Sequence, residues 1–422
     1  MSTRRVVAKN TAMQVVGKII TAFSTLAVTM LVTRRFGPEG FGQFMIMTTF
    51  PALFWIMVQF GFNEIVVREI KKREEKTQVL FSNLLVLRLI LAVFFTAVAL
   101  FTLFAVLPYD ADVKLGATLN LVTLFVMSFY STAQVLFQAK LAYNLQLISQ
   151  VIGSLGGLAF SIAMIFLGKP VLWVALGSLI GYSTMAFSAS LLVSRFVSFK
   201  KLEWCPARAK KLFKMALPVG LALIFNIFDF KIDSLMLSAL PLKTTVSNNS
   251  AVGFYSSAFK IFEVILTLPF FFMNSVYPFM VEKVNEGEKL FPVLGKSVSF
   301  LLAVSILGVV VGIPLAPHLI YFVAGSGFGA SVKVLRTLLY SLPVFFLTSL
   351  LSRTVLVLEK QKVLPWIYGA ATVLNIVLNM IYIPRYTYTA AAVITGVTEV
   401  FVLVLLVVAL RKSLLVSCSS EL

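Results

Sequence analysis

Long apolar segments recur along the whole chain, and they limit what it can fold into more than any other feature. Each is about 20 residues or longer and nearly free of charge, enough to cross the ~30 Å hydrocarbon core of a bilayer as an α-helix. Hydrophobic residues make up 59% of the chain and charged residues 13%, whereas soluble proteins carry about 25% charge. The sequence therefore excludes a soluble enzyme and predicts an all-α integral membrane protein with about 12 transmembrane helices. The predicted spans cover residues 11–33, 41–63, 79–107, 113–139, 147–168, 170–194, 212–240, 252–281, 293–323, 333–358, 363–384 and 388–410.

The net charge of +19 is explained by where the Lys and Arg residues lie relative to the predicted spans. Of the Lys and Arg residues between the predicted spans, 23 fall on one side of the membrane and 7 on the other. Because cytoplasmic loops carry the excess of Lys and Arg, the richer side is cytoplasmic. We predict a multi-pass protein of the cell (inner, cytoplasmic) membrane with both termini in the cytoplasm and no nucleic-acid partner.

The longest hydrophilic stretch, Arg195 to Lys214, lies at the midpoint of the chain. It predicts an N-terminal bundle over residues 1–195, a basic cytoplasmic linker over 196–214 and a C-terminal bundle over 215–422. A weak internal repeat supports the division, since Phe41-Gly42 resembles Val252-Gly253 at the start of the second and eighth spans. Two bundles of six helices each share one orientation, which predicts a pseudo-two-fold axis along the membrane normal.

Ten charged side chains lie within the predicted spans. Each costs ~2.5–3.5 kcal/mol at the bilayer centre, so they must pair with one another or face water. They are Lys18, Arg88, Lys231, Lys260, Arg336, Arg353, Asp229, Asp233, Glu263 and Glu399.

The seventh span carries acidic residues on one face. Asn226, Asp229 and Asp233 follow i, i+3, i+7 spacing, which aligns them on a helix. Lys231 points more than ~100° away from this stripe. A carboxylate pair in a confined cavity is what a transporter needs to bind Na⁺ or take up a proton. The alternative is that both acids pair with cations on neighbouring helices.

Cations dominate the spans of the first half. Lys18 and Arg88 have almost no acidic residues near them in these spans, and an excess of cation facing a cavity indicates an anionic substrate group, best a phosphate or pyrophosphate. In the eighth span Lys260 and Glu263 are three residues apart, and their alternative role is a self-satisfied ion pair.

Motifs in a fixed order then resemble one family, the oligosaccharide-lipid flippases (polysaccharide transporters) of the multidrug/oligosaccharidyl-lipid/polysaccharide exporter superfamily. The motifs are Lys9-Asn10, Arg35-Phe36-Gly37-Pro38-Glu39-Gly40-Phe41-Gly42, Gly61-Phe62-Asn63, Arg68-Glu69-Ile70, Arg88, Ala216-Leu217-Pro218, Asp233, Val252-Gly253-Phe254-Tyr255, Ala258-Phe259-Lys260-Ile261, Glu263, Tyr277-Pro278, Gly325-Ser326-Gly327-Phe328, Asn375, Asn379 and Ile383-Pro384.

The resemblance implies a MATE-like fold and a non-enzymatic function. Such flippases move a polyprenyl-(pyro)phosphate-linked oligosaccharide from the cytoplasmic to the outer leaflet by alternating access, drawing on an ion gradient. It implies that Lys18, Arg88 and Lys260 hold the pyrophosphate. It likewise implies ion coupling through Asn226, Asp229, Asp233 and Glu263. No cofactor is predicted besides coupled Na⁺ or H⁺, and the implied partners are the lipid-linked oligosaccharide, the membrane and glycan-assembly enzymes of the same pathway.

Two other functions fit the sequence less well. A drug/cation antiporter of the same fold would need an anionic cavity, and the cations of the first half argue against it. A membrane-embedded glycan polymerase or ligase would need a sizeable outer segment with clustered Arg and His. The chain has a single histidine, His318, and no predicted outer loop exceeds ~12 residues.

Overall fold

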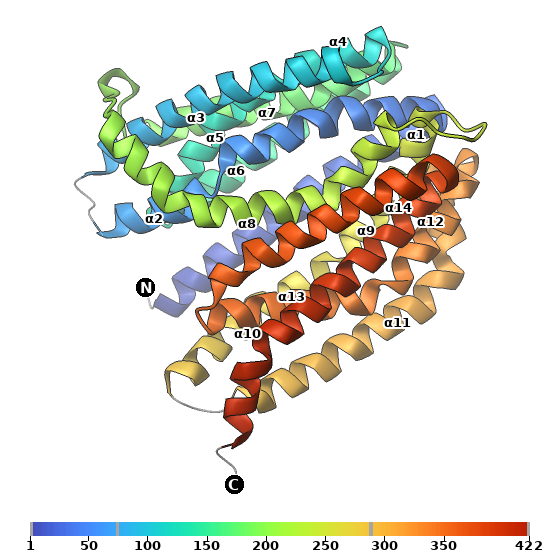
Figure 1. The fold of residues 1–422 in the computed structure, drawn as a ribbon. Helices are drawn as coiled ribbons and strands as arrows, with labels where there is room; N and C mark the ends of the chain where they lie inside the picture. Colours follow the sequence, from blue (N-terminus) through green and yellow to red (C-terminus); the bar gives the residue numbers. More distant parts are fainter. Residues whose placement is uncertain (1–2, 73–75, 287–289, 420–422) are drawn as a thin grey trace. The chain divides into compact units, whose positions relative to one another are not determined.

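The computed structural model describes the backbone of residues 3–72, 76–286 and 290–419 (Figure 1). Side chains are described over the same ranges except at 3–12, 14–15, 222, 226, 229–230, 274, 285 and 412–419. Every regular element in these ranges is a helix, which confirms the predicted all-α class. The chain divides into two compact units, Met1–Ile224 and Phe225–Leu422.

The first unit contains seven α-helices and the beginning of an eighth, with a π-helical turn at Thr102–Val106 and a 3₁₀ turn at Phe199–Lys201. The helices are α1 (Thr3–Gln59), α2 (Phe62–Lys72), α3 (Thr77–Phe101), α4 (Ala111–Asn120), α5 (Thr123–Ala139), α6 (Tyr143–Phe166), α7 (Val171–Val193) and α8 (Pro206–Ala239).

The second unit begins inside α8 and continues with six further helices, interrupted by 3₁₀ turns at Ser326–Phe328 and Gln361–Val363. These helices are α9 (Asn248–Ile265), α10 (Thr267–Asn285), α11 (Phe291–Ala324), α12 (Gly329–Tyr340), α13 (Leu342–Val357) and α14 (Leu364–Ser419).

The described helices fit about 12 membrane spans. Eight of them are long and apolar enough to cross a membrane, and α12 with α13, bent by 46°, makes a ninth. Two of the eight, over 16–72 and 361–411, are 57 and 51 residues long, enough for two ~30 Å crossings each at 1.5 Å per residue. The 34 residues of α8 supply one more.

Each of the two very long helices contains a sharp backbone break. In α1 the break is at Gly37, with φ 64°, directly before Pro38. Only glycine adopts this left-handed conformation without cost, and proline pre-sets the start of the next helical segment. In α14 the break is at Thr387, with φ 51°. Each break divides one long helix into two helical segments and lets the chain reverse its direction between them.

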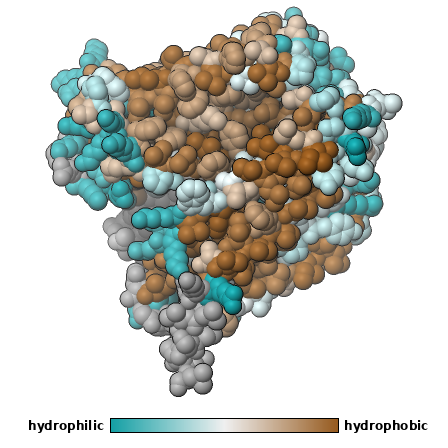
Figure 2. Space-filling model, viewed as in Figure 1, coloured by the Kyte–Doolittle hydropathy of each residue, from teal (hydrophilic) through white to brown (hydrophobic). Residues whose placement is uncertain are grey.

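Both units show an apolar band in the space-filling view. In Figure 2 hydrophobic side chains cover the middle of each unit's visible face and hydrophilic ones gather at the ends. Large apolar side chains that face outward include Phe94 on α3, Phe187 on α7 and Val310 on α11. An apolar exterior is the pattern of helices that meet lipid rather than water.

The connection between α7 and α8 is fastened to α3 by two amide side chains. Gln78 accepts from the Ser198 N–H at 2.8 Å and donates to the Ser198 and Lys201 carbonyls, both at 2.9 Å. Asn83 accepts from the Cys205 N–H at 2.9 Å and donates to the Glu203 carbonyl at 3.2 Å. These bonds satisfy backbone groups outside the α-helices, of which the Ser198 carbonyl also accepts from the Lys201 N–H within the 3₁₀ turn.

The first turns of α8 pack into the same unit. Phe213 stacks on Phe60 with ring centroids 4.9 Å apart and planes 5° apart. Leu212 and Ala216 are buried in a cluster with Phe62 on α2. The boundary between the two units therefore lies within a continuous helix.

Small residues allow α6 and α7 to approach closely. Gly153, Gly157 and Ser161 recur at every fourth position of α6 and face Gly177 and Gly181 of α7. A Cβ on Gly157 would lie 2.7 Å from the Gly177 carbonyl oxygen and 3.1 Å from the Gly181 Cα. Membrane helices use such small-residue interfaces to bring backbones into contact.

We expect Gly157→Ala to destabilise the protein by about 1–3 kcal/mol, because the added methyl meets backbone atoms that cannot move aside. The matched control is Gly295→Ala on α11, where a Cβ has nothing within 4 Å. Thermal unfolding of both purified variants measures the difference. A Gly157→Ala protein as stable as the Gly295→Ala protein would contradict the predicted close packing.

Candidate functional site

The second unit holds a buried carboxylate surrounded by neutral donors. Asp233 of α8 has 0% of its surface exposed. Its Oδ2 accepts from the Tyr255 hydroxyl at 2.9 Å and the Thr395 hydroxyl at 2.7 Å, and its Oδ1 accepts from Asn379 Nδ2 at 2.6 Å. Among the described residues no cation forms an ion pair with Asp233. The charge is compensated by hydrogen bonds from α9 and α14 alone.

More oxygens lie around this carboxylate, which we call the Asp233 cluster together with Tyr255, Asn375, Asn379 and Thr395. Asn375 Oδ1 lies 2.7 Å from Asn379 Nδ2, and the Ala391 carbonyl lies 2.9 Å from the Thr395 hydroxyl oxygen. Helical geometry brings them together, because Asn375 with Asn379 and Ala391 with Thr395 are each four residues apart.

Two amide atoms of the Asp233 cluster have no hydrogen-bond partner although they are buried. They are Asn379 Oδ1 and Asn375 Nδ2. A half-turn of the Asn379 amide exchanges its two ends and directs Oδ1 toward Asp233. Carboxylate, amide, hydroxyl and carbonyl oxygens are the ligand types that hard cations prefer. The Asp233 cluster can therefore hold a small hard cation or a proton on Asp233.

The sequence also predicts two further residues on the helix face that carries Asp233. The side chains of Asn226 and Asp229 lie outside the described residues, so the predicted carboxylate pair stays a prediction. The alternative is that both acids pair with cations on neighbouring helices. For Asp233 no such pair occurs among the described residues, and Lys231 itself contacts Glu263 of α9.

Lys231, Glu263 and Lys260 form a charged cluster between α8 and α9. Glu263 Oε1 lies 3.4 Å from Lys231 Nζ, and Glu263 Oε2 lies 3.1 Å from Lys260 Nζ. The Lys231 ammonium also lies 5.7 Å from the centroid of the Phe259 ring. The ion pair expected from the spacing of Lys260 and Glu263 is thus present, and a second lysine joins it. One carboxylate between two ammonium groups leaves a net charge of +1.

Arg88 is the buried cation of the first unit. It lies on α3 with 0% of its surface exposed. Its Nη2 donates to Asn63 Oδ1 at 2.6 Å and its Nη1 to the Thr132 hydroxyl at 3.0 Å, while Nε is buried without a partner. No carboxylate pairs with it among the described residues. Its guanidinium donates hydrogen bonds to neutral oxygens of α2 and α5, and Glu64 of α2 adds a favourable electrostatic interaction without a hydrogen bond.

The remaining predicted pyrophosphate ligands differ in their surroundings. Lys18 lies on α1 with an exposed side chain, whereas Arg88 lies inside the same unit. Lys260 belongs to the second unit and is half-buried. Their joint role in binding pyrophosphate stays a prediction.

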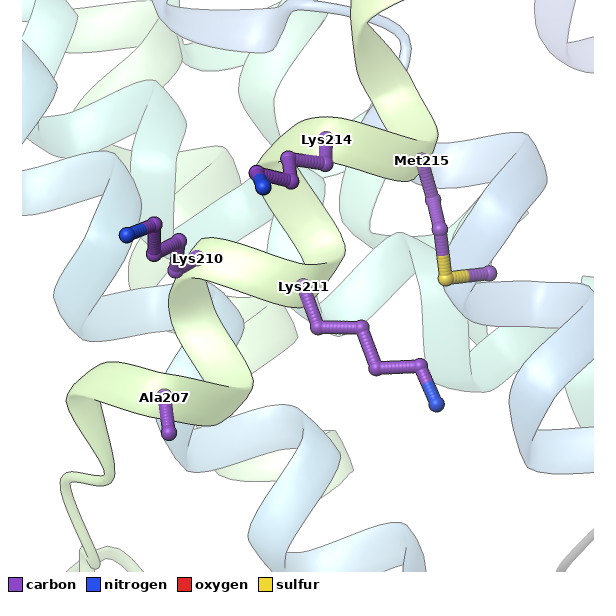
Figure 3. A pocket seen from close by; sticks show the side chains of 5 residues that line it. All are labelled: Ala207, Lys210, Lys211, Lys214 and Met215. Carbon is purple, nitrogen blue, oxygen red and sulfur yellow. The ribbon is translucent and has the colours of Figure 1, made fainter.

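A basic pocket lies at the start of α8. It has a volume of about 360 Å³ and is lined by Ala207, Lys210, Lys211, Lys214 and Met215. Figure 3 shows Lys210 and Lys214 extending from one side of α8, while Lys211 leaves in another direction with Met215 beside it. These lysines fall in the stretch predicted to be a basic linker, and from Pro206 onward that stretch is helical.

Sequence reasoning assigned no role to several residues that complete these sites. Asn375 and Asn379 contributed to the family resemblance only as motif residues, and Tyr255 only as part of a repeat and a motif. The sequence did indicate a polar site at Asn375 and Asn379, since two asparagines four residues apart in an apolar helix need buried partners. Thr395 and Asn63 gave a weaker signal, because single hydroxyls and amides are common in membrane helices.

Comparison with known proteins places this geometry in a class. The chain resembles a structure titled "Lipid II flippase MurJ, inward closed conformation", with a TM-score of 0.78 at 15% identity over 96% of this chain and 87% of that one. It also resembles an inward-facing multidrug resistance MATE family transporter of the MOP superfamily, with a TM-score of 0.77 at 17% identity over 95% and 96%. A MOP superfamily transporter from Pyrococcus furiosus gives 0.65 at 16% identity over 99% and 96%. The chain therefore shares the all-helical fold of these structures.

A family model makes the assignment more specific. The model described as "Polysaccharide biosynthesis protein" matches residues 7–284, well over half of the chain. The chain therefore belongs to the polysaccharide biosynthesis protein family, which confirms the resemblance found in its motifs. None of the curated proteins matches the sequence.

The Arg88 contacts yield a test of how the buried charge is held. We expect Asn63→Ala to destabilise the protein by about 1.5–3 kcal/mol, the range for a hydrogen bond to a charged group. In an Arg88→Met background the same substitution should cost much less, because no charge then needs the amide oxygen. A double-mutant cycle on thermal stability measures this coupling. Equal costs in both backgrounds would show that Asn63 does not stabilise the guanidinium.

Proposed function

We propose that this protein is a flippase that carries a polyprenyl-(pyro)phosphate-linked oligosaccharide from the cytoplasmic to the outer leaflet by alternating access. Membership of a polysaccharide biosynthesis family supports a glycan-related substrate. The transporter fold supports movement across the membrane rather than bond chemistry. The basic loops support an orientation with both termini in the cytoplasm.

The observation that carries the proposal is an excess of positive over negative charge around three cations of the described residues. Arg88 is buried, hydrogen-bonds only to neutral oxygens and, among the described residues, has its one acidic interaction with Glu64, to which it is not hydrogen-bonded. Lys231 and Lys260 share a single described carboxylate. Phosphate groups are strong acceptors for guanidinium and ammonium donors. A lipid-linked phosphate or pyrophosphate is therefore the substrate group that this charge distribution favours, and a cationic drug is not.

We expect Arg88→Ala to abolish export of the glycan per molecule of protein, because the substrate phosphate loses a cationic partner. Protein abundance is measured in the same cells, since the substitution also removes the bonds of the buried guanidinium to Asn63 and Thr132. The matched control is Arg336→Ala on α12, whose exposed side chain donates to the Ile313 carbonyl. The measurement is the membrane face on which lipid-linked glycans accumulate, determined in intact cells and inside-out vesicles before extraction. They should accumulate on the cytoplasmic face in a deletion strain and in Arg88→Ala cells.

Normal export in Arg88→Ala cells would remove Arg88 from the substrate path. Short or absent lipid-linked glycans in the deletion strain would indicate a glycan polymerase or ligase instead. Loss of cationic-drug efflux with unchanged glycans would indicate the drug/cation antiporter.

The proposal includes coupling to Na⁺ or H⁺ at Asp233. Support comes from its complete burial, with no ion-paired cation among the described residues, and from the oxygen-rich cluster around it. A carboxylate that binds a cation in one conformation and releases it in another links transport to the ion gradient.

We expect Asp233→Asn to make transport independent of the ion gradient, since the neutral amide holds neither a cation nor a transferable proton. The control is Glu399→Gln, another buried acid of the second unit, hydrogen-bonded to Thr348. Two measurements apply: transport into vesicles with and without a gradient, and the thermal stability of the purified protein in Na⁺ against K⁺. Unchanged gradient dependence in Asp233→Asn vesicles would contradict the coupling role.

A further inference from the structure

Glu263 lies between two lysines, which the proposed function alone does not explain. We propose that Glu263 is a placeholder anion: its carboxylate neutralises Lys231 and Lys260 until the phosphate group of the substrate replaces it between the two ammonium groups. This inference rests on the proposed function and adds Lys231 to the substrate site. It gives Glu263 a role different from the ion coupling predicted from sequence.

The geometry fits an exchangeable anion. Lys231 Nζ and Lys260 Nζ approach different oxygens of the same carboxylate, at 3.4 and 3.1 Å. Each ammonium has three N–H donors, and Glu263 occupies one on each. Among the described residues neither lysine has another acceptor, so donors remain for the additional oxygens of a phosphate. A phosphate spanning the same two ammonium groups would restore both contacts and add further ones.

Exposure distinguishes this cluster from the other charged sites. The side chains of Lys231, Lys260 and Glu263 are 29%, 21% and 45% exposed, whereas Asp233 and Arg88 are sealed. Because charges in spanning helices are not exposed to lipid without a large cost, this exposed surface faces water. An anion can therefore reach the two lysines without opening the core of the unit.

The two lysines also differ in how they are held. Lys260 and Glu263 are three residues apart on α9, so they stay together whatever α8 does. Lys231 is contributed by α8 and rests over the Phe259 ring. An anion binding here joins α8 to α9 through Lys231, as Glu263 does in its absence.

The position of Lys231 keeps this site separate from the Asp233 cluster. Two residues along a helix correspond to a rotation of about 200°, so Lys231 and Asp233 lie on nearly opposite faces of α8. Substitutions at Lys231 and Glu263 therefore remove no hydrogen-bond partner of Asp233.

The test uses the purified full chain in lipid nanodiscs, with inorganic pyrophosphate as the probe and titration calorimetry as the measurement. We expect Lys231→Met to weaken pyrophosphate binding at least tenfold, and this variant retains a balanced Lys260–Glu263 ion pair that supports folding. We expect Glu263→Gln to strengthen binding several-fold, because the competing carboxylate is removed. Lys333→Gln, at an exposed lysine of α12, is the matched control and should bind like the wild type.

The opposite changes in pyrophosphate affinity expected for Lys231→Met and Glu263→Gln decide the proposal. Weaker or unchanged binding in Glu263→Gln overturns the placeholder role, and unchanged binding in Lys231→Met overturns it by itself if Glu263→Gln does not fold. Failure of the proposed function has a different outcome: the binding changes occur as expected, but deletion of the protein leaves lipid-linked glycans correctly distributed. In that case the replacement of the Glu263 carboxylate by a phosphate is still supported, and the substrate is another phosphate-bearing molecule.

Discussion

The cost of holding a charge away from water governs how the polar residues of this bundle are arranged. The described part of the chain compensates such charges in three ways. Arg88 is surrounded by neutral oxygens, Asp233 by neutral donors, and Glu263 is shared by two lysines. The first two are fully buried and the third is partly exposed. Buried charges with incomplete partners are costly to retain in a membrane, which is why they are interpreted as functional groups.

Much of the fold could be predicted because the length of an apolar run translates directly into a span. The predicted sixth span, 170–194, corresponds to α7 at Val171–Val193, and the predicted seventh, 212–240, to most of α8 at Pro206–Ala239. The break at Thr387 falls between the predicted spans 363–384 and 388–410. The 46° bend between α12 and α13 lies inside the predicted span 333–358 and was not predicted. Hydropathy records how much apolar surface a segment carries, whereas bends depend on the packing of neighbouring helices.

The site could be predicted only within single helices. Spacing along α9 identified Lys260 and Glu263 as neighbours, and the spacing along α8 marked Asp233. It could not indicate that Lys231 reaches Glu263 from another helix, or that Asn379 and Thr395 donate to Asp233 from α14. Contacts between helices depend on how the helices are rotated and placed, and a single sequence holds no record of that placement.

The continuity of α8 has a mechanical consequence. Its first turns are packed against Phe60 in one unit, and its later turns carry Lys231 and Asp233 in the other. Lys231 and Asp233 lie on nearly opposite faces of the same helical segment, so a rotation of that segment about its own axis displaces the two side chains in opposite senses. A rotation that moves the carboxylate therefore moves the ammonium group as well, without a chain of intervening side-chain contacts.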